Sequence, residues 1–116
     1  MKIIDETINE EQFQRQVIEL AGLKGWLVAH FRPAKVDDGN GGYTYRTAVS
    51  ADGKGFPDMV LAKKNHEVIF AEIKSESGKL SAEQTTWYVT LKQCPGVKAF
   101  VWKPRDWDEI LKVLGE

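Results

Sequence analysis

The chain has 116 residues, which suits a single domain with a hydrophobic core and no need of disulfide bonds. Hydrophobic residues make up 42% of the sequence and charged residues 28%, and no apolar run approaches the ~20 residues of a membrane span, which argues against a disordered or membrane-spanning chain. The formal net charge of -1 lacks the basic excess that often marks nucleic-acid-binding proteins, although it permits a local basic patch. We expect one intracellular domain, residues 1–116, with no membrane partner.

The sequence contains a single cysteine, Cys94. This excludes an intramolecular disulfide bond and a cysteine-rich zinc site. We expect Cys94 to be a small buried hydrophobic residue.

The N-terminal half predicts a helix, a strand and a long connection. Residues 9–25, "NEEQFQRQVIELAGLKG", carry apolar side chains at helical spacing between a candidate N-cap, Asn9, and a terminating glycine, Gly25. The segment "WLVAHF" then predicts a short strand. Residues 33–57 are rich in glycine and predict an irregular connection with room for a short ribbon around "YTYRT". Long connections of this kind in compact domains are commonly functional.

The C-terminal half alternates strands and helices. It predicts two strands in a hairpin pattern, a helix, a strand and a last helix, at residues 58–63, 67–74, 81–94, 97–102 and 106–114. The first of these helices starts with a capping box, Ser81 with Gln84 three residues on. The order α, β, loop, β, β, α, β, α predicts an α/β fold, a mixed sheet flanked by helices.

Two acidic residues and a lysine lie in the predicted hairpin. Side chains alternate along a strand, so Glu72 and Lys74 point to the same side. If the two strands pair around a turn centred on Asn65, Asp58 lies opposite Glu72 with Cβ atoms ~5 Å apart. Two carboxylates this close are unfavourable unless a positive charge lies between them. Oxygen ligands favour Mg²⁺ or Mn²⁺ over zinc, so the pattern predicts a metal site beside Lys74.

A Glu and a Lys two residues apart also have an ordinary explanation. Exposed pairs at strand ends are common and contribute only ~0.5 kcal/mol. The functional interpretation depends on the whole set of features: the "GFPD" before the first strand, the hairpin spacing, the apolar residues around Glu72 and the polar cluster after Lys74.

The segments "GFPDMVL" and "VIFAEIKSESGKLSAEQTTWYVTL" resemble the PD-(D/E)XK nuclease motif, and in particular the VRR-NUC (virus-type replication-repair nuclease) family. The similarity extends to "NEEQFQRQVIELAGLKGW" and "VWKPRDWDEIL", and so covers most of the chain apart from residues 33–54. The resemblance implies a restriction-endonuclease-like fold and a metal-dependent DNA endonuclease.

The resemblance also implies a role for each matching residue of the hairpin and the following helix. Asp58 and Glu72 match the metal-binding carboxylates, which are helped by the backbone carbonyl of Ile73. Lys74 matches the lysine that positions or activates the attacking water. Gln84 matches a glutamine of the family, and we leave open whether it contacts the site or the DNA, or serves only in its capping box.

The family supplies a further glutamate from the first helix, and this sequence offers Glu10 and Glu11. Glu10 shares a helix face with Phe13 and Val17 and so points inward. We therefore expect Glu10 to join the catalytic set, with a contact to the metal made directly or through water.

Basic residues in or beside the long connection, and one after the catalytic strand, are candidates for DNA contacts. Together they could line a groove that follows the phosphates, although each one alone is better explained as an ordinary solvated surface charge. The candidates are Arg32, Lys35, Arg46, Lys54 and Lys79. We expect the isolated His30 and His66 to be non-catalytic, and the four tryptophans to be core residues.

The function predicted from these features is Mg²⁺- or Mn²⁺-dependent hydrolysis of DNA, branched or duplex. Stand-alone members of the family act as homodimers on four-way (Holliday) junctions, which implies the same assembly and substrate here, a role in DNA repair, and a phage or prophage origin in the bacterial cytoplasm. Other classes stay open: a catalytically silent DNA-binding module on the same fold, a sequence-specific restriction-type endonuclease, and a regulatory domain that binds Mg²⁺ for another purpose.

Overall fold

The computed structural model describes residues 5–115. Its centre is a four-stranded mixed sheet in the order β1-β4-β5-β6. The strands are β1 (Leu27–His30), β4 (Met59–Ala62), β5 (Val68–Ile73) and β6 (Val97–Trp102). Strands β1, β4 and β5 are antiparallel neighbours, whereas β5 and β6 are parallel. The predicted mixed α/β fold is therefore confirmed.

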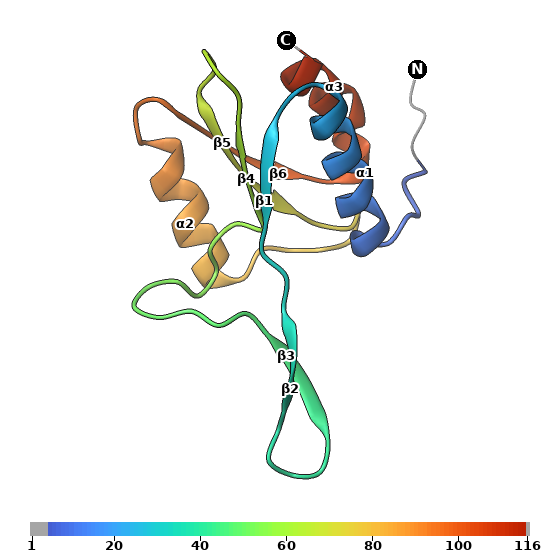
Figure 1. Ribbon diagram of the computed structural model, residues 1–116, viewed down its shortest axis with the longest axis vertical. Coiled ribbons are helices and arrows are strands. Elements are labelled where there is room, and N and C mark those ends of the chain that lie inside the picture. The colour runs from blue at the N-terminus through green and yellow to red at the C-terminus, as the bar shows by residue number, and fades with distance from the viewer. Residues whose placement is uncertain (1–4, 116) are drawn as a thin grey trace.

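Three helices flank this sheet (Figure 1). Helices α1 (Glu10–Leu23) and α3 (Trp107–Gly115) lie side by side, and α2 (Ala82–Lys92) lies on the opposite side, where it connects β5 to β6. A parallel pair needs such a crossover, because a tight turn can join only antiparallel strands. One hydrophobic cluster fills the space between the sheet and α1 and α3, with Phe13, Trp102 and Ile110 fully buried. Within the described residues, no helix has both the length and the apolar character needed to cross a bilayer.

Short-range hydrogen bonds set the helix starts. Asn9 and Gln12 form a capping box at α1, and Ser81 forms the predicted one with Gln84 at α2. The last helix differs slightly from the prediction. A 3₁₀ turn, η1 (Pro104–Asp106), precedes α3, and the Asp106 carboxylate accepts a hydrogen bond from the backbone N–H of Lys103 at 2.8 Å.

Two expectations about single residues need correction. Cys94 is exposed, because it lies in the turn that ends α2, where its thiol contacts the carbonyl of Thr90 at 3.5 Å. Trp87 is only half-buried on α2, while the other three tryptophans are core residues as expected.

The long connection contains the short ribbon expected around "YTYRT". Strands β2 (Ala34–Asp37) and β3 (Tyr43–Arg46) pair with each other and form a separate two-stranded sheet. This ribbon projects away from the main sheet (Figure 1). The remaining part, residues 47–57, returns to the body before β4.

Candidate active site

One cleft, of about 740 Å³, lies at the end of the sheet where β1 leaves for the ribbon and β4 begins. The structure places all five predicted catalytic residues along its walls: Glu10, Asp58, Glu72, Lys74 and Gln84. They come from α1, the start of β4, the end of β5 and the first turn of α2. Residues distant in sequence are thus brought to one place by the pairing of β4 with β5 and by the two helices.

The β4–β5 hairpin positions the two acidic residues. Its register pairs Met59 with Ala71 and Leu61 with Ile69, which is the pairing predicted for a turn centred on Asn65. Asp58 is the residue before Met59, and its Oδ2 accepts a hydrogen bond from the backbone N–H of Ile73 at 2.9 Å. The carboxyl groups of Asp58 and Glu72 therefore lie against each other at the end of the hairpin.

Glu72 is a buried carboxyl group, with 4% of its surface exposed. Burial is the main cause that raises the pKa of Glu72 to about 9, and the charge of Asp58 and a hydrogen bond between the two carboxyl groups act in the same direction. The positive charge of Lys74 opposes them without cancelling the effect. In the absence of a cation, the raised pKa favours the protonated form of Glu72 at neutral pH.

Gln84 has two roles at once. Its side-chain Oε1 accepts from the backbone N–H of Ser81 at 2.8 Å, which completes the capping box of α2. Its Nε2 donates to Oε1 of Glu72 at 3.0 Å. The two explanations left open from the sequence are therefore compatible, because the amide uses its oxygen for the helix and its nitrogen for the site.

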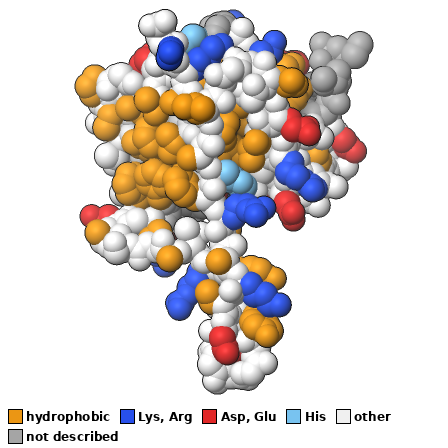
Figure 2. Space-filling view, viewed as in Figure 1, with side chains coloured by type: hydrophobic (Ala, Val, Ile, Leu, Met, Phe, Trp, Pro, Cys, Tyr) orange, Lys and Arg blue, Asp and Glu red, His pale blue; other side chains and the backbone are white. Residues whose placement is uncertain are grey.

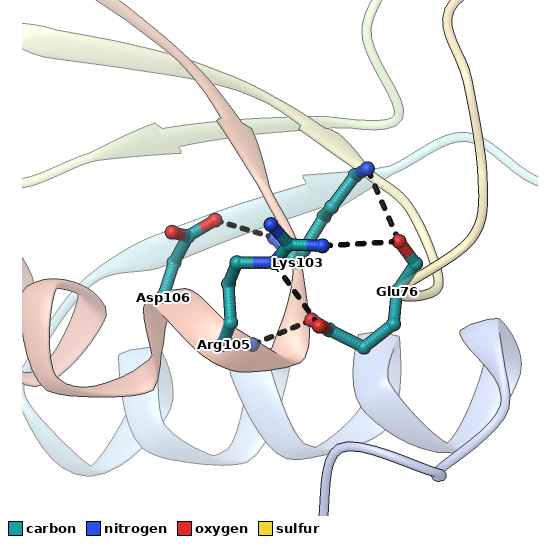
Figure 3. Close-up of polar contacts among 4 residues, drawn as sticks. All are labelled: Glu76, Lys103, Arg105 and Asp106. Carbon is teal, nitrogen blue, oxygen red and sulfur yellow. Dashed lines mark hydrogen bonds and ion pairs between the residues drawn. The ribbon is translucent and has the colours of Figure 1, made fainter.

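The segment after β5 is fixed to Lys103 and to the 3₁₀ turn η1, which precede α3 (Figure 3). The backbone N–H of Lys74 donates to the carbonyl of Trp102 at 3.0 Å. Two residues on, Glu76 accepts from the Arg105 backbone N–H at 2.7 Å and from its Nε at 3.0 Å, and the Glu76 carbonyl accepts from Nζ of Lys103 at 3.2 Å. These contacts hold the backbone on both sides of Lys74, so its side chain starts from a fixed position.

Residues 47–57 are held against α2 and so fix Asp58 from the other side. The indole Nε1 of Trp87 donates to the carbonyl of Asp52 at 3.0 Å, and the ring of Phe56 meets Trp87 edge to face at 5.0 Å. Gly55 has φ 85°, and a Cβ at this position would lie 2.6 Å from the backbone of Glu83. Only glycine combines this backbone conformation with this close approach.

The first helix contributes acidic side chains at the rim of the cleft. Glu10 and Glu11 both line it. The pKa of Glu10 is raised by desolvation first and also by the charge of Asp58, while Lys74 acts in the opposite direction. Glu10 therefore lies within the electrostatic influence of Asp58 and Lys74. It is exposed and does not point into the core as expected, and helix phase does not separate it from Glu11, because both residues line the cleft.

The predicted DNA-contact residues are spread over a wider surface. Arg32 lines the cleft itself, and Arg46 lines a neighbouring cavity that also reaches Asp58. The ammonium of Lys35 lies over the ring of Tyr43, 4.0 Å from its centroid, and that of Lys54 is 3.7 Å from Glu83. Lys79 is exposed beyond β5. The cleft thus holds one of the five, and the ribbon and the following loop carry three.

The residues along the cleft that were missed or set aside in the sequence include Arg15, His30 and Tyr45. Arg15 lies on α1 one turn beyond Glu11, so helical spacing could have found it. His30 ends β1, and among the described residues its buried Nε2 has no hydrogen-bond partner. Tyr45 gives no sequence signal of this kind, because it reaches the cleft only through the path of the ribbon.

The residues present suit an oxygen-preferring divalent cation. Asp58 and Glu72 supply a pair of carboxyl groups that can bind a cation when Glu72 releases its proton, and the backbone N–H of Ile73 holds Asp58 in place. Within residues 5–115, no group of three or more His, Cys, Asp or Glu side chains is arranged to hold an ion alone. Mg²⁺ commonly keeps several waters and takes one or two protein carboxylates, so two are sufficient.

A family model described as the VRR-NUC domain matches residues 45–105 of the chain. The match includes Asp58, Glu72, Lys74 and Gln84 and leaves α1 with Glu10 outside it. No curated protein and no solved structure matches the chain. The matched segment is about half of the sequence and contains the hairpin, the crossover helix and β6. The chain therefore belongs to the VRR-NUC domain family and is a nuclease of the PD-(D/E)XK type.

Proposed function

We propose that the chain is a divalent-metal-dependent endonuclease that hydrolyses phosphodiester bonds in DNA, with Mg²⁺ or Mn²⁺ as its cofactor. The observation that carries this proposal is the buried Glu72 carboxyl group, held between Asp58 and Gln84 beside Lys74. Burying two carboxyl groups together costs free energy in the absence of a cation, and a cation reverses that cost.

When bound, the cation polarises the phosphate and lowers the pKa of its bound water. The residues of the chain then have separate tasks. Asp58, fixed by the N–H of Ile73, and Glu72, fixed by Gln84, hold the ion. Lys74 orients the attacking water and supplies positive charge as negative charge builds up on the phosphate oxygens. Glu10 assists from the rim, directly or through water.

The surface around the cleft supports DNA as the substrate. Figure 2 shows Lys and Arg side chains where the ribbon joins the body and along the ribbon itself. Arg32 lies in the cleft, and Lys35 and Arg46 lie on β2 and β3. A local group of this kind attracts phosphates even though the net charge of the chain is -1. We propose that Arg32, Lys35, Arg46, Lys54 and Lys79 contact the DNA backbone.

Cleavage of labelled linear and four-way-junction DNA in Mg²⁺, Mn²⁺ or EDTA tests the reaction. We expect cutting only with metal, and its loss in Asp58→Asn. Binding without cutting would instead support a silent DNA-binding module, and neither binding nor cutting would support a regulatory Mg²⁺-binding domain. Glu10→Gln and Glu11→Gln form a matched pair, since both residues line the cleft. Glu10→Gln should slow cutting at least tenfold, whereas Glu11→Gln should change it less than threefold.

We further propose that residues 1–116 act as one nuclease domain, in the cytoplasm of a bacterial or phage-infected cell, as a homodimer that prefers four-way junctions. One active site cuts one strand, and a two-fold dimer supplies a second site at a fixed distance. Leu23 and Leu27 are 85% and 78% exposed and offer apolar surface for such a contact.

Light scattering should give twice 13.1 kDa, and a monomer at micromolar concentration would refute the dimer. Equal rates on a junction and on its constituent duplexes, at matched salt and metal, would refute junction selectivity. That result would favour a plain or restriction-type endonuclease.

A further inference from the structure

The β2–β3 ribbon exposes aromatic side chains that the fold does not use. It is paired with no other strand, and seven of its eight strand residues are exposed, Val36 being half-buried. Tyr43 and Tyr45 are 65% and 66% exposed. An isolated two-stranded hairpin is marginally stable in water. The fold therefore gives no packing reason for two large rings on this ribbon.

The two rings lie on one face together with a cation. Side chains alternate along a strand, so Tyr43 and Tyr45 point to the same side, and the register places Lys35 opposite Tyr45. The Lys35 ammonium lies over the Tyr43 ring, which stabilises the ribbon. Aromatic rings interleaved with positive charge are the combination that binds single-stranded nucleic acid, where rings stack on bases and cations meet phosphates.

The position of Tyr45 connects this face to the active site. Tyr45 lines the same cleft as Asp58, Glu72 and Lys74, and Arg32 lies there too. A nucleotide whose phosphate is held at the acidic pair therefore has a neighbour within reach of the ribbon. A ring can stack on that neighbour only if its base has left the duplex stack, because paired bases present only their edges.

We propose that Tyr45, with Tyr43 further along the ribbon, stacks on an unpaired base next to the scissile phosphate, so that the ribbon selects DNA with unpaired nucleotides over continuous duplex. This inference rests on the proposed binding and cutting of DNA in the cleft, and it does not depend on the preference for four-way junctions, whose arms are fully paired. It specifies which feature of the substrate the ribbon recognises. The tyrosines would detect whether a base is paired, which the basic residues cannot do, because phosphate contacts carry no information about pairing.

Binding in Ca²⁺ to two DNAs tests the proposal: a duplex interrupted by an unpaired 2-aminopurine, and the fully paired duplex. We expect wild type and Tyr45→Phe to quench the 2-aminopurine fluorescence. Tyr45→Leu should not quench it, and should lose about fivefold to a hundredfold in affinity for the interrupted duplex, which corresponds to the loss of one base–aromatic contact. Its affinity for the paired duplex should change less than twofold. Tyr45 lies outside the hydrophobic core, so the variants should fold as wild type does.

Tyr88→Leu is the matched control. Its ring also has a lysine over it, with Nζ of Lys92 at 5.3 Å, but it lies on α2 and does not line the cleft. An equal loss of affinity for both DNAs in Tyr45→Leu would overturn the stacking role and leave only backbone contact. Unchanged binding, or a change of oligomeric state instead, would assign the ribbon to another purpose and also refute the proposal. Metal-dependent cutting by wild type, measured in parallel, separates failure of this inference from failure of the proposed function.

Discussion

Replacing Glu72 by glutamine should stabilise the protein in the absence of metal and abolish cutting. The raised pKa means that the folded protein keeps the Glu72 proton up to about pH 9, while the unfolded chain releases it above about pH 4.5. Stability from this group is therefore fully present below the lower value and is lost as pH rises between the two. Glutamine resembles the protonated acid: its oxygen can accept from Gln84 and its amide can donate to Asp58.

The size of the stability difference follows from how far the working pH lies above the pKa of Glu72 in the unfolded chain. At pH 7.5 this distance is ~3 pH units, which sets an upper limit of about 4 kcal/mol on the difference in unfolding free energy. Relaxation around a coupled pair reduces this, and we expect about 2 kcal/mol, or a rise in Tm on the order of 8 °C for a domain of this size. At pH 5 the working pH lies close to the pKa of Glu72 in the unfolded chain. The unfolding free energies of the variant and the wild type should then differ by less than about 0.5 kcal/mol.

Urea unfolding in EDTA at pH 5 and at pH 7.5 measures this difference directly. Repeating it with Mg²⁺ gives a second test, since a ligand stabilises only the protein that binds it, and wild type should gain more than the variant. A stability difference that does not grow between the two pH values would show that Glu72 is ionised in the folded protein, and the reasoning about the buried pair would be wrong.

Three further substitutions test the supports of the site. Lys74→Ala should leave the fold and metal-induced stabilisation intact and reduce cutting at least a hundredfold, as measured by calorimetry and single-turnover kinetics; loss of metal binding would contradict this. Gln84→Glu keeps the oxygen that caps α2 but sets a negative charge against Glu72, so cutting should fall more than tenfold. Ser81→Ala is its control: loss of the cap should cost about 1 kcal/mol of stability and leave cutting intact at low temperature. Gly55→Ala should cost about 3 kcal/mol of stability and slow cutting by displacing Asp58. Gly41→Ala is its control, because Gly41 also has a positive φ, 82°, but an added Cβ there would meet no atom. An equal effect of the two changes would show that the close approach of Gly55 to α2 is unimportant.

The parts of the site that follow local rules were predictable from sequence. The register of the hairpin depends only on the spacing of Asp58 and Glu72 about Asn65, which adopts φ 67°, a conformation that asparagine tolerates in turns. The capping box at Ser81 is equally local. Alternation along β5 then sets Lys74 on the side of Glu72. These local rules predict that Asp58, Glu72 and Lys74 lie close together, without any knowledge of the rest of the fold.

What the sequence could not supply are contacts set by the path of the chain. The second hydrogen bond of Gln84 depends on how α2 is placed over β5, a placement fixed by long-range packing. The exposure of Cys94 depends on which side of α2 faces the sheet, and α2 has few buried residues to reveal it. Tyr45 reaches the cleft because the ribbon starts and ends there, and no periodicity within residues 33–57 encodes that.

The ribbon leaves and rejoins the body beside Asp58, which places a long connection next to a small cleft. At its start, the backbone N–H of Phe31 donates to the carbonyl of Asp58 at 2.8 Å. At its end, Phe56 meets the ring of Phe31 edge to face at 5.6 Å. The entropic cost of closing a connection grows only slowly with its length, so the extra residues of the ribbon add little to the cost of closing this base. These contacts hold Asp58 at the closed base, so the outer part of the ribbon can adjust to a bound DNA strand without displacing the carboxylate that we propose as a metal ligand.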